Sequence, residues 1–472
     1  MVLSLVSLVR HSCNHRSGGG ARMRSSLVLF LTFAGLGGGP PTAAAAEKPN
    51  VVFLLADDLG YGDLGCTGHP YAKTPAIDRL ARDGTLFHNF YVAGATCCPS
   101  RAGLMTSRFP ASFQKYPASF GFSGAVTVTD LLKRNGYRTG HFGKWHMGDE
   151  QKNGTYGIDL IKVAGGNHRD PRGRDADIAD AAIDFIKANK DGPFYVNVWF
   201  HTPHNPVRPP KSFADRFAGL TLKREDFPNP DFQKYLDLYK KLGGNIDDGM
   251  RNYLGDVSQL DDQVARVLKA IDDLGLRKNT VVVFTSDNGP GNGTGPDTDN
   301  PPKKREKLSE NLLGSAGPLR ERKHSLHDGG IRLPFIVRWP GHVPAGRVDE
   351  KSVIAGVDWL PTLCALAGAR VEADKFDGED VSDIWLGKER ERKKDLFWKA
   401  SRPHSPTVIR RANWKLYQPH RGPGELYDLS KDPGEREDVA AKNPAVVKEL
   451  AAALQRWNAK LPTSYEKGAG DE

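Results

Sequence analysis

The apolar positions along the chain follow two patterns, which predict buried strands and amphipathic helices. Nearly continuous apolar runs, typical of strands buried on both faces, occur at residues 51–55, 195–200, 281–285 and 335–339. Apolar residues spaced as on one face of a helix occur between these runs, at residues 75–83, 175–189 and 257–271. Strands that alternate with helices predict an α/β sandwich with a large mixed, mostly parallel sheet flanked by helices.

The pattern changes near residue 395, where short strand-like segments precede one last helical pattern. The strand-like segments lie at residues 408–409, 414–417 and 425–429, and the helical pattern lies at residues 444–457. They predict a small antiparallel sheet with a helix. We therefore divide the chain after its leader into a main domain, residues 47–394, and a C-terminal subdomain, residues 395–472. A polar, Gly- and Pro-rich loop at residues 290–318 is either functional or a solvated excursion.

The first 46 residues have the organisation of a secretory leader. An Arg-Met-Arg triplet at residues 22–24 precedes the apolar run 27–36, and small residues follow at 42–46. A basic segment, a short apolar segment and a small-residue cleavage zone are the parts of a signal peptide. We expect residues 1–46 to be removed, with Met23 as a candidate start. The mature protein would be exported, periplasmic or secreted; an uncleaved membrane anchor is the alternative.

Net charge and cysteine usage narrow the classes of function. The formal charge of the 472 residues is +9, and it falls to +5 (9 − 4) without the leader and its four arginines. A mildly basic surface suits an anionic substrate, and no nucleic-acid-binding motif is present. No apolar run after the leader reaches the ~18 residues that a membrane span needs. The remaining cysteines show neither a disulfide-framework spacing nor a C-x-x-C motif.

Three of the predicted strands end in polar residues suited to binding or catalysis. Asp57 and Asp58 follow the first strand. Asp287 and Asn288 follow the third, and His204 lies shortly after the second. Ligand sites of open α/β sheets lie beyond the carboxyl ends of the strands, so we expect these groups to converge. Carboxylate and amide oxygens suit Ca²⁺ or Mg²⁺ better than Zn²⁺; a capped turn is the alternative for the Asp-Asp pair alone.

Residues 97–108, CCPSRAGLMTSR, resemble a known signature. The signature is C-x-P-S-R-x-x-L-x-T-G-R of the type I sulfatases, and Cys97 takes its leading position. Other segments resemble the same family in the same order; they are PNVVFLLADDLGYGDLG, GKWHMG, PHNP, SDNG, KHSLHDGGIRLPFIVRWPG and LYDLSKDPGE. The chain is similar to the arylsulfatase and N-acetylgalactosamine-6-sulfatase branch. The resemblance implies an alkaline-phosphatase-like fold.

The resemblance also implies a reaction and two cofactors. In this family the leading cysteine is oxidised to formylglycine by a formylglycine-generating enzyme, which would be a partner of this chain. One hydroxyl of the hydrated aldehyde attacks sulfur, and deprotonation of the other then eliminates sulfate. The family's calcium ligands match Asp57, Asp58, Asp287 and Asn288, with modified Cys97 beside them. The implied activity is hydrolysis of O-sulfate esters of a sulfated saccharide or an aryl sulfate.

The remaining positions carried by the resemblance are basic. Arg101 would hold the aldehyde hydrate, and Lys144 and His146 match residues that contact formylglycine and sulfate. His204, rather than His201, matches the sulfate-binding histidine. Lys323 matches a second sulfate-binding lysine, a partner for the leaving oxygen. A transition state rich in negative charge needs such donors.

Two positions depart from the family pattern. Ser107 stands where the signature usually has glycine, which bears on recognition by the maturing enzyme rather than on the chemistry. Asp328 replaces the more usual glutamate before Gly329 and Gly330.

Other functions stay open from the residues themselves. A phosphate or phosphonate ester hydrolase of the same superfamily would need more His and Asp ligands and a Ser or Thr nucleophile, and Asn288 and Cys97 argue against it. A non-catalytic polyanion-binding homologue would keep the fold and never receive the aldehyde. Taken alone, Cys97 and Cys98 fit a pair of small buried thiols.

Overall fold

Strand β1 (Asn50–Asp57) lies in the middle of the main sheet, and its side chains alternate between two cores. Val51, Phe53 and Leu55 face one core, and the residues between them face the other. A strand buried on both faces is therefore continuously apolar, as predicted. The computed structural model describes residues 48–122, 124–148, 151–293, 308–400, 405–464 and 466. The predicted leader and residues 294–307 of the polar loop lie outside the described residues.

The main sheet, within the described residues, contains nine strands in the order β4-β3-β5-β1-β6-β7-β2-β8, with β9 paired to β2. Its pairings are parallel except for those of β7, which runs antiparallel to β6 and β2. The other strands are β2 (Thr85–Tyr91), β3 (Arg138–Gly143), β4 (Leu160–Lys162), β5 (Phe194–Pro203), β6 (Thr280–Ser286), β7 (Arg332–Arg338), β8 (Arg347–Asp349) and β9 (Ile354–Ala355).

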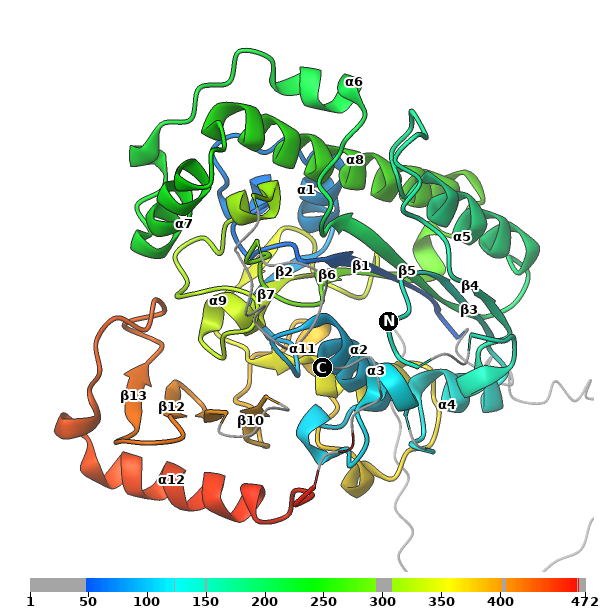
Figure 1. Cartoon of the computed structure of the whole chain (residues 1–472). Coiled ribbons are helices and arrows are strands. Elements are labelled where there is room, and N and C mark those ends of the chain that lie inside the picture. The colour runs from blue at the N-terminus through cyan, green and yellow to red at the C-terminus, as the bar shows by residue number, and fades with distance from the viewer. Residues whose placement is uncertain are drawn as a thin grey trace, which may run out of the picture. The chain divides into compact units, whose positions relative to one another are not determined.

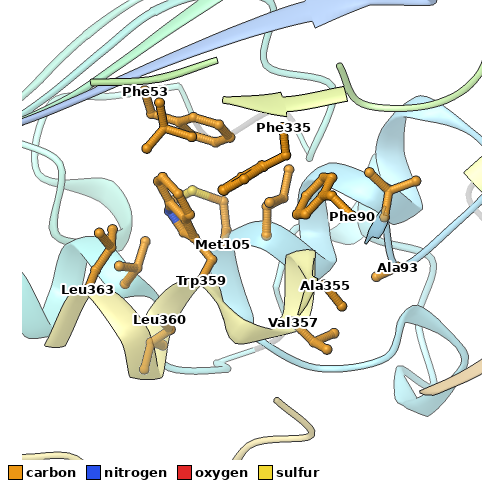
Figure 2. Close-up of a cluster of buried hydrophobic side chains, with 14 of the residues drawn as sticks. Phe53, Phe90, Ala93, Met105, Phe335, Ala355, Val357, Trp359, Leu360 and Leu363 are labelled. Atoms are coloured by element: carbon orange, nitrogen blue, oxygen red, sulfur yellow. The ribbon is translucent and has the colours of Figure 1, made fainter. Parts of the chain in front are cut away.

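Helices cover both faces of this sheet (Figure 1). Helices α1, α5 and α8 pack on one face, and α2, α4, α10 and α11 pack on the other. Figure 2 shows part of the core on the face covered by α2 and α10. There Phe53 of β1 meets Trp359 of α10, with ring centroids 4.2 Å apart. The helices are α1 (Pro75–Arg82), α2 (Cys97–Thr106), α3 (Pro117–Phe120), α4 (Val128–Arg134), α5 (Ala176–Ala188), α6 (Lys211–Ala214), α7 (Pro230–Lys241), α8 (Ile246–Asp273), α9 (Asp328–Ile331), α10 (Trp359–Leu366) and α11 (Ser382–Trp385).

A second, antiparallel sheet lies near the C-terminus, in the order β10-β11-β12-β13. Its apolar side chains pack against α12 (Pro444–Asn458), where Leu416 meets Leu450 and Leu454. The strands are β10 (Leu396–Lys399), β11 (Thr407–Arg411), β12 (Trp414–Gln418) and β13 (Glu425–Asp428). The predicted fold class, an α/β sandwich plus a small antiparallel sheet with a helix, is confirmed. The expected domain boundary at residue 394 stays a prediction.

Helix α8 is longer than the sequence pattern predicted. The predicted stripe began at residue 257, whereas the helix begins at Ile246. Asn245 caps it, because its side chain accepts a hydrogen bond from Asp248 N, and Tyr253 continues the buried stripe. Strands β2 and β3 were not predicted at all. None of the helices in the described ranges is long and apolar enough to cross a membrane.

Asp256 of α8 makes stability depend on pH. Its carboxylate is fully buried, and Gln259 Nε2 donates to Oδ1. Burial raises the pKa of Asp256 to about 7; Arg174 opposes this rise, and Asp175 and Glu310 add to it. The unfolded carboxyl ionises near 3.8. Between pH of about 4 and about 7 the folded protein therefore binds more protons at Asp256 than the unfolded protein does. The free energy of unfolding falls as pH rises through this range.

We therefore expect Asp256→Asn to raise the melting temperature at pH 8 by more than at pH 4. The gain in unfolding free energy at pH 8 should be about 2 kcal/mol or more. Thermal denaturation at both pH values measures it, with exposed Asp191→Asn as the control. Equal shifts at the two pH values would show that Asp256 ionises normally in the folded protein.

Candidate active site

The carboxyl ends of β1, β5 and β6 bring the predicted polar residues together. β1 pairs in parallel with β6 through Ala56 and Ser286 and with β5 through Asp57 and Pro203. The residues that follow these strands therefore share one edge of the sheet, as the sequence predicted. Asn288 Nδ2 donates to an oxygen of the Asp58 carboxylate at 2.7 Å.

Helix α2 carries Cys97 to this edge. The Cys97 thiol is buried, with Sγ 3.2 Å from Asp57 Oδ1 and 3.8 Å from Asp58 Oδ1. Cys97 lies in the first turn of the helix, where the peptide dipoles favour a negative charge. The structure therefore places the leading cysteine of the signature against the strand-end carboxylates.

Arg101, one turn further along α2, is a fully buried partner of two carboxylates. Its Nε and Nη2 lie 2.9 and 2.7 Å from Asp287 Oδ2, and Nη2 lies 3.6 Å from Asp57 Oδ1. Its guanidinium also lies over the ring of Trp199, 5.1 Å from the centroid. Burial opposes the charge, but Asp287 and Asp57 raise the pKa of Arg101, so it stays protonated. Burial and Asp57 also raise the pKa of Asp287 to about 6, against the effect of Arg101.

Two lysines reach the same group from different segments. Lys144 follows β3, and its Nζ lies 2.7 Å from Asp57 Oδ2. Lys323 Nζ lies 2.9 Å from Asp58 Oδ1 and 3.4 Å from Cys97 Sγ. Burial alone would raise the pKa of Asp57, but Lys144, His204 and Arg101 hold it well below the usual range. Asp57 is therefore ionised.

Of the two histidines after β5, His204 faces the carboxylates. Its Nε2 lies 3.8 Å from Asp58 Oδ2, and its Nδ1 bonds the carbonyl oxygen of Asn205 at 2.8 Å. His201 instead places Nε2 3.0 Å from the carbonyl oxygen of Ala164. This geometry agrees with the choice of His204. His146 lies two residues after Lys144 in a left-handed backbone conformation, with φ of 61°, and its role stays a prediction.

Sequence reasoning missed the residues that hold His204 in place. Arg174 is buried, and it donates to the carbonyl oxygens of His201, His204 and Pro206, the last two at 2.6 and 2.8 Å. The neighbouring Asp175 Oδ2 accepts from the backbone nitrogen of His201 at 2.8 Å. Both residues lie at the start of a predicted helix, where an acidic residue is typical of an N-terminal helix cap. The Asp175 side chain makes no capping bond, and it serves the turn after β5 instead.

The donor atoms fit a divalent cation. Asp57, Asp58, Cys97 and His204 each offer a ligand atom, and these four atoms lie within 4.8 Å of one another. Asn288 Oδ1 is buried and has no hydrogen-bond partner among the described residues. A buried amide oxygen that no protein group satisfies, next to carboxylates, is a suitable ligand for a hard cation. The predicted ligand Asp287 is not among these four residues, and Arg101 bonds its Oδ2.

Ser107, which replaces the usual glycine of the signature, ends α2 in a left-handed conformation with φ of 52°. Glycine adopts this conformation without strain, whereas serine does not. The Ser107 hydroxyl compensates, because it accepts a hydrogen bond from Leu360 N at 2.9 Å. The departure from the signature is therefore accommodated in the folded protein.

We expect Ser107→Ala to destabilise the protein by about 1–3 kcal/mol, because it keeps the strain and leaves Leu360 N without its acceptor. Ser107→Gly loses the same bond but relieves the strain, so it should cost about 1 kcal/mol less than alanine. Urea denaturation of both variants measures the difference. If the glycine variant proved as unstable as the alanine variant, the backbone would not be strained at this position.

Comparisons with known proteins show the family of the chain. A family model described as Sulfatase matches residues 49–369, and one described as N-sulphoglucosamine sulphohydrolase, C-terminal, matches residues 321–460. Arylsulfatase A of Homo sapiens is 33% identical over 501 residues, covering 94% of this chain and 92% of that protein. An N-acetylgalactosamine-6-O-sulfatase of Bacteroides thetaiotaomicron is 28% identical over 518 residues, covering 87% and 93%.

Among solved structures, Ps i-CgsB in complex with k-i-k-neocarrahexaose superimposes with a TM-score of 0.72 and 27% identity, covering 89% of this chain and 95% of that chain. The matches span most of the chain, and they show that it is a sulfuric ester hydrolase. The chain belongs to the sulfatase family.

Proposed function

We propose that this protein is an exported enzyme that hydrolyses O-sulfate esters of carbohydrates, with formylglycine made from Cys97 and one bound calcium ion. The observation that carries the proposal is the position of Cys97 Sγ, 3.2 Å from Asp57 Oδ1 and 3.4 Å from Lys323 Nζ. A nucleophile is thus held between a candidate metal ligand and a cation. The similar proteins named for sulfated sugars support a carbohydrate substrate.

The residues present fit both cofactors. Asp57, Asp58, Asp287 and Asn288, with the modified Cys97, would hold the calcium ion. Formylglycine would supply a hydrated carbonyl as the nucleophile, and calcium would supply a fixed positive charge beside it.

The chain's own side chains prepare the site for an anion. Arg101, Lys144 and Lys323 balance three carboxylates in the described part of the site. A divalent cation would therefore leave the site with net positive charge, which suits a sulfate ester. Lys144 and Lys323 come from different segments of the chain, and His204 adds a donor from a third segment. Such fixed donors stabilise charge that develops on the sulfuryl oxygens and on the leaving oxygen.

Rates on paired substrates test the activity. The chain would be co-expressed with a formylglycine-generating enzyme and assayed on 4-nitrophenyl sulfate, on 4-nitrophenyl phosphate and on defined sulfated mono- and oligosaccharides. We expect the sulfate ester to be cleaved faster. Faster cleavage of the phosphate would make the phosphate or phosphonate ester hydrolase the correct function.

Mass spectrometry tests maturation and export. The peptide that contains Cys97 should carry the aldehyde after co-expression, and the exported protein should begin near residue 47. An unmodified thiol in an inactive protein would favour the non-catalytic polyanion-binding homologue. A retained leader would favour the membrane anchor.

A further inference from the structure

Lys323 belongs to a loop, residues 320–328, that touches two other segments of the site. Lys323 N donates to the carbonyl oxygen of Pro290 at 3.2 Å, and His324 N donates to that of Ala95 at 2.9 Å. Pro290 lies just after Asn288, and Ala95 lies just before Cys97. Glu321 and His324 have positive φ values, 64° and 75°, which only a well-determined surrounding structure maintains. The position of the Lys323 ammonium therefore depends on what holds this loop.

A fully buried group of one lysine and two carboxylates holds the end of the loop. Lys415 lies on β12 in the C-terminal sheet, and its Nζ is 2.7 Å from Asp328 Oδ1 and 2.7 Å from Glu435 Oε1. Glu435 Oε2 accepts from Asp328 N at 2.6 Å, and Tyr91 OH donates to Asp328 Oδ2 at 2.6 Å. Lys415 thus bonds the last residue of the loop, which is also the first residue of α9, to the C-terminal sheet.

Burial and charge oppose each other in this group. Burial raises the pKa of Glu435 to about 7, against the effect of Lys415. Burial would raise the pKa of Asp328, but Lys415, Arg332 and Arg410 lower it to about 2, so it is ionised opposite the ammonium. Lys415, Asp328 and Glu435 each have 0% relative exposure. A buried ion pair is costly to desolvate, and an apolar cluster of similar volume often stabilises a fold equally well. A role that needs directional bonds accounts better for the charges.

The C-terminal sheet also holds the other parts of the loop. Arg320 Nη1 donates to Tyr427 OH at 2.9 Å and to the carbonyl oxygen of Glu435 at 3.1 Å. The His327 ring stacks on Tyr417 of β12, with centroids 4.5 Å apart and an angle of 18° between the planes. The two ends of the loop therefore rest on β12, β13 and the turn after them, and Lys323 projects from the middle.

We propose that Lys415 is a positioning residue for the sulfatase site, acting through Asp328 and the loop 320–328 to place the Lys323 ammonium beside Asp58 and Cys97. The inference rests on the proposed function, in which Lys323 contacts the sulfate ester. It makes the C-terminal sheet a part of the construction of the active site.

A double-mutant cycle with Lys323 tests the inference on the full-length, matured protein. Lys415→Met should lower kcat/KM for 4-nitrophenyl sulfate about 10- to 100-fold, because small displacements of a catalytic group cost this much. In a Lys323→Ala background the same change should cost less than about threefold, because the group that it positions is absent. Equal losses in both backgrounds would show a general structural effect and overturn the inference.

Hydrogen–deuterium exchange provides a readout that does not need activity. Peptides covering residues 320–328 should exchange faster in Lys415→Met, while those covering β1 should not change. Unchanged exchange in the loop would overturn the inference. If the matured protein without substitutions proved inactive on every sulfate ester, the proposed function would fail, and the exchange measurement alone would decide whether Lys415 positions the loop.

Two further variants separate positioning from loss of folding. Lys415→Met leaves two carboxyl groups without their lysine, so Lys415→Met/Glu435→Gln is added, which removes one of them and keeps an acceptor for Asp328 N. The double variant should melt closer to the parent protein and still exchange faster in the loop. Lys399→Met is the matched control in the same sheet, because Lys399 Nζ bonds Asn458 Oδ1 at 2.8 Å instead. It should change neither kcat/KM nor exchange in the loop.

Discussion

Cys97→Ala abolishes the hydrolysis of sulfate esters, with an expected loss in kcat of at least about 10⁴-fold. The reason is geometric, because the Cys97 side chain reaches Asp57, Asp58 and Lys323 together. Alanine removes the atom that maturation would convert to the aldehyde. The measurement is turnover of 4-nitrophenyl sulfate by protein co-expressed with the formylglycine-generating enzyme.

The adjacent cysteine is the matched control. Cys98 is buried in the same helical turn, so Cys98→Ala makes the same chemical change one position along. It should retain most of the activity. Equal losses in the two variants would mean that the nucleophile has been assigned to the wrong cysteine. Circular dichroism of both variants checks that the protein as a whole still folds.

Asp287→Ala loses bound calcium and activity together, with an expected fall in kcat of at least about 100-fold. Asp287 Oδ1 accepts from Asp58 N at 3.2 Å, and Oδ2 holds Arg101. Its removal takes away a proposed ligand, releases the Asp58 backbone and leaves the buried Arg101 charge with less compensation. Elemental analysis after dialysis measures the metal, and rates with added calcium measure the activity.

The control for the metal experiment is Asp191→Ala, at an exposed position paired with Lys190. It should keep both calcium and activity. A chelator should inactivate the parent protein, and added calcium should restore it. An unchanged rate after chelation, or an Asp287→Ala protein that retains calcium, would remove the metal from the proposal.

Local patterns predicted the central strands well because those strands are buried on both faces. β1, β5 and β6 are apolar runs, and the polar residues at their ends were found by position; the family resemblance then selected His204 over His201. β2 and β3 were missed because polar residues interrupt them. His88 and Asn89 break the run in β2, and Arg138 and His141 break it in β3. His88 bonds Tyr61 OH, and Asn89 donates to the carbonyl oxygen of Glu350, so their partners lie in other segments and a single segment does not reveal them.

The supporting residues of the site could not be predicted in the same way. Arg174 carries no motif, and its role comes from three carbonyl oxygens about 30 residues further along the chain. Lys415 meets Asp328 across 87 residues. Charged residues are usually exposed, so the sequence offers no signal that these two are buried.

The sequence by itself determined the fold class and the sulfatase family, because strand periodicity and the cysteine signature are local properties of the chain. Only the tertiary structure showed that Arg174 holds the turn that carries His204. It also showed that Ser107 is accommodated and that the C-terminal sheet carries the Lys323 loop. These features depend on distances and burial between segments that are far apart in the chain, and composition and spacing do not record them.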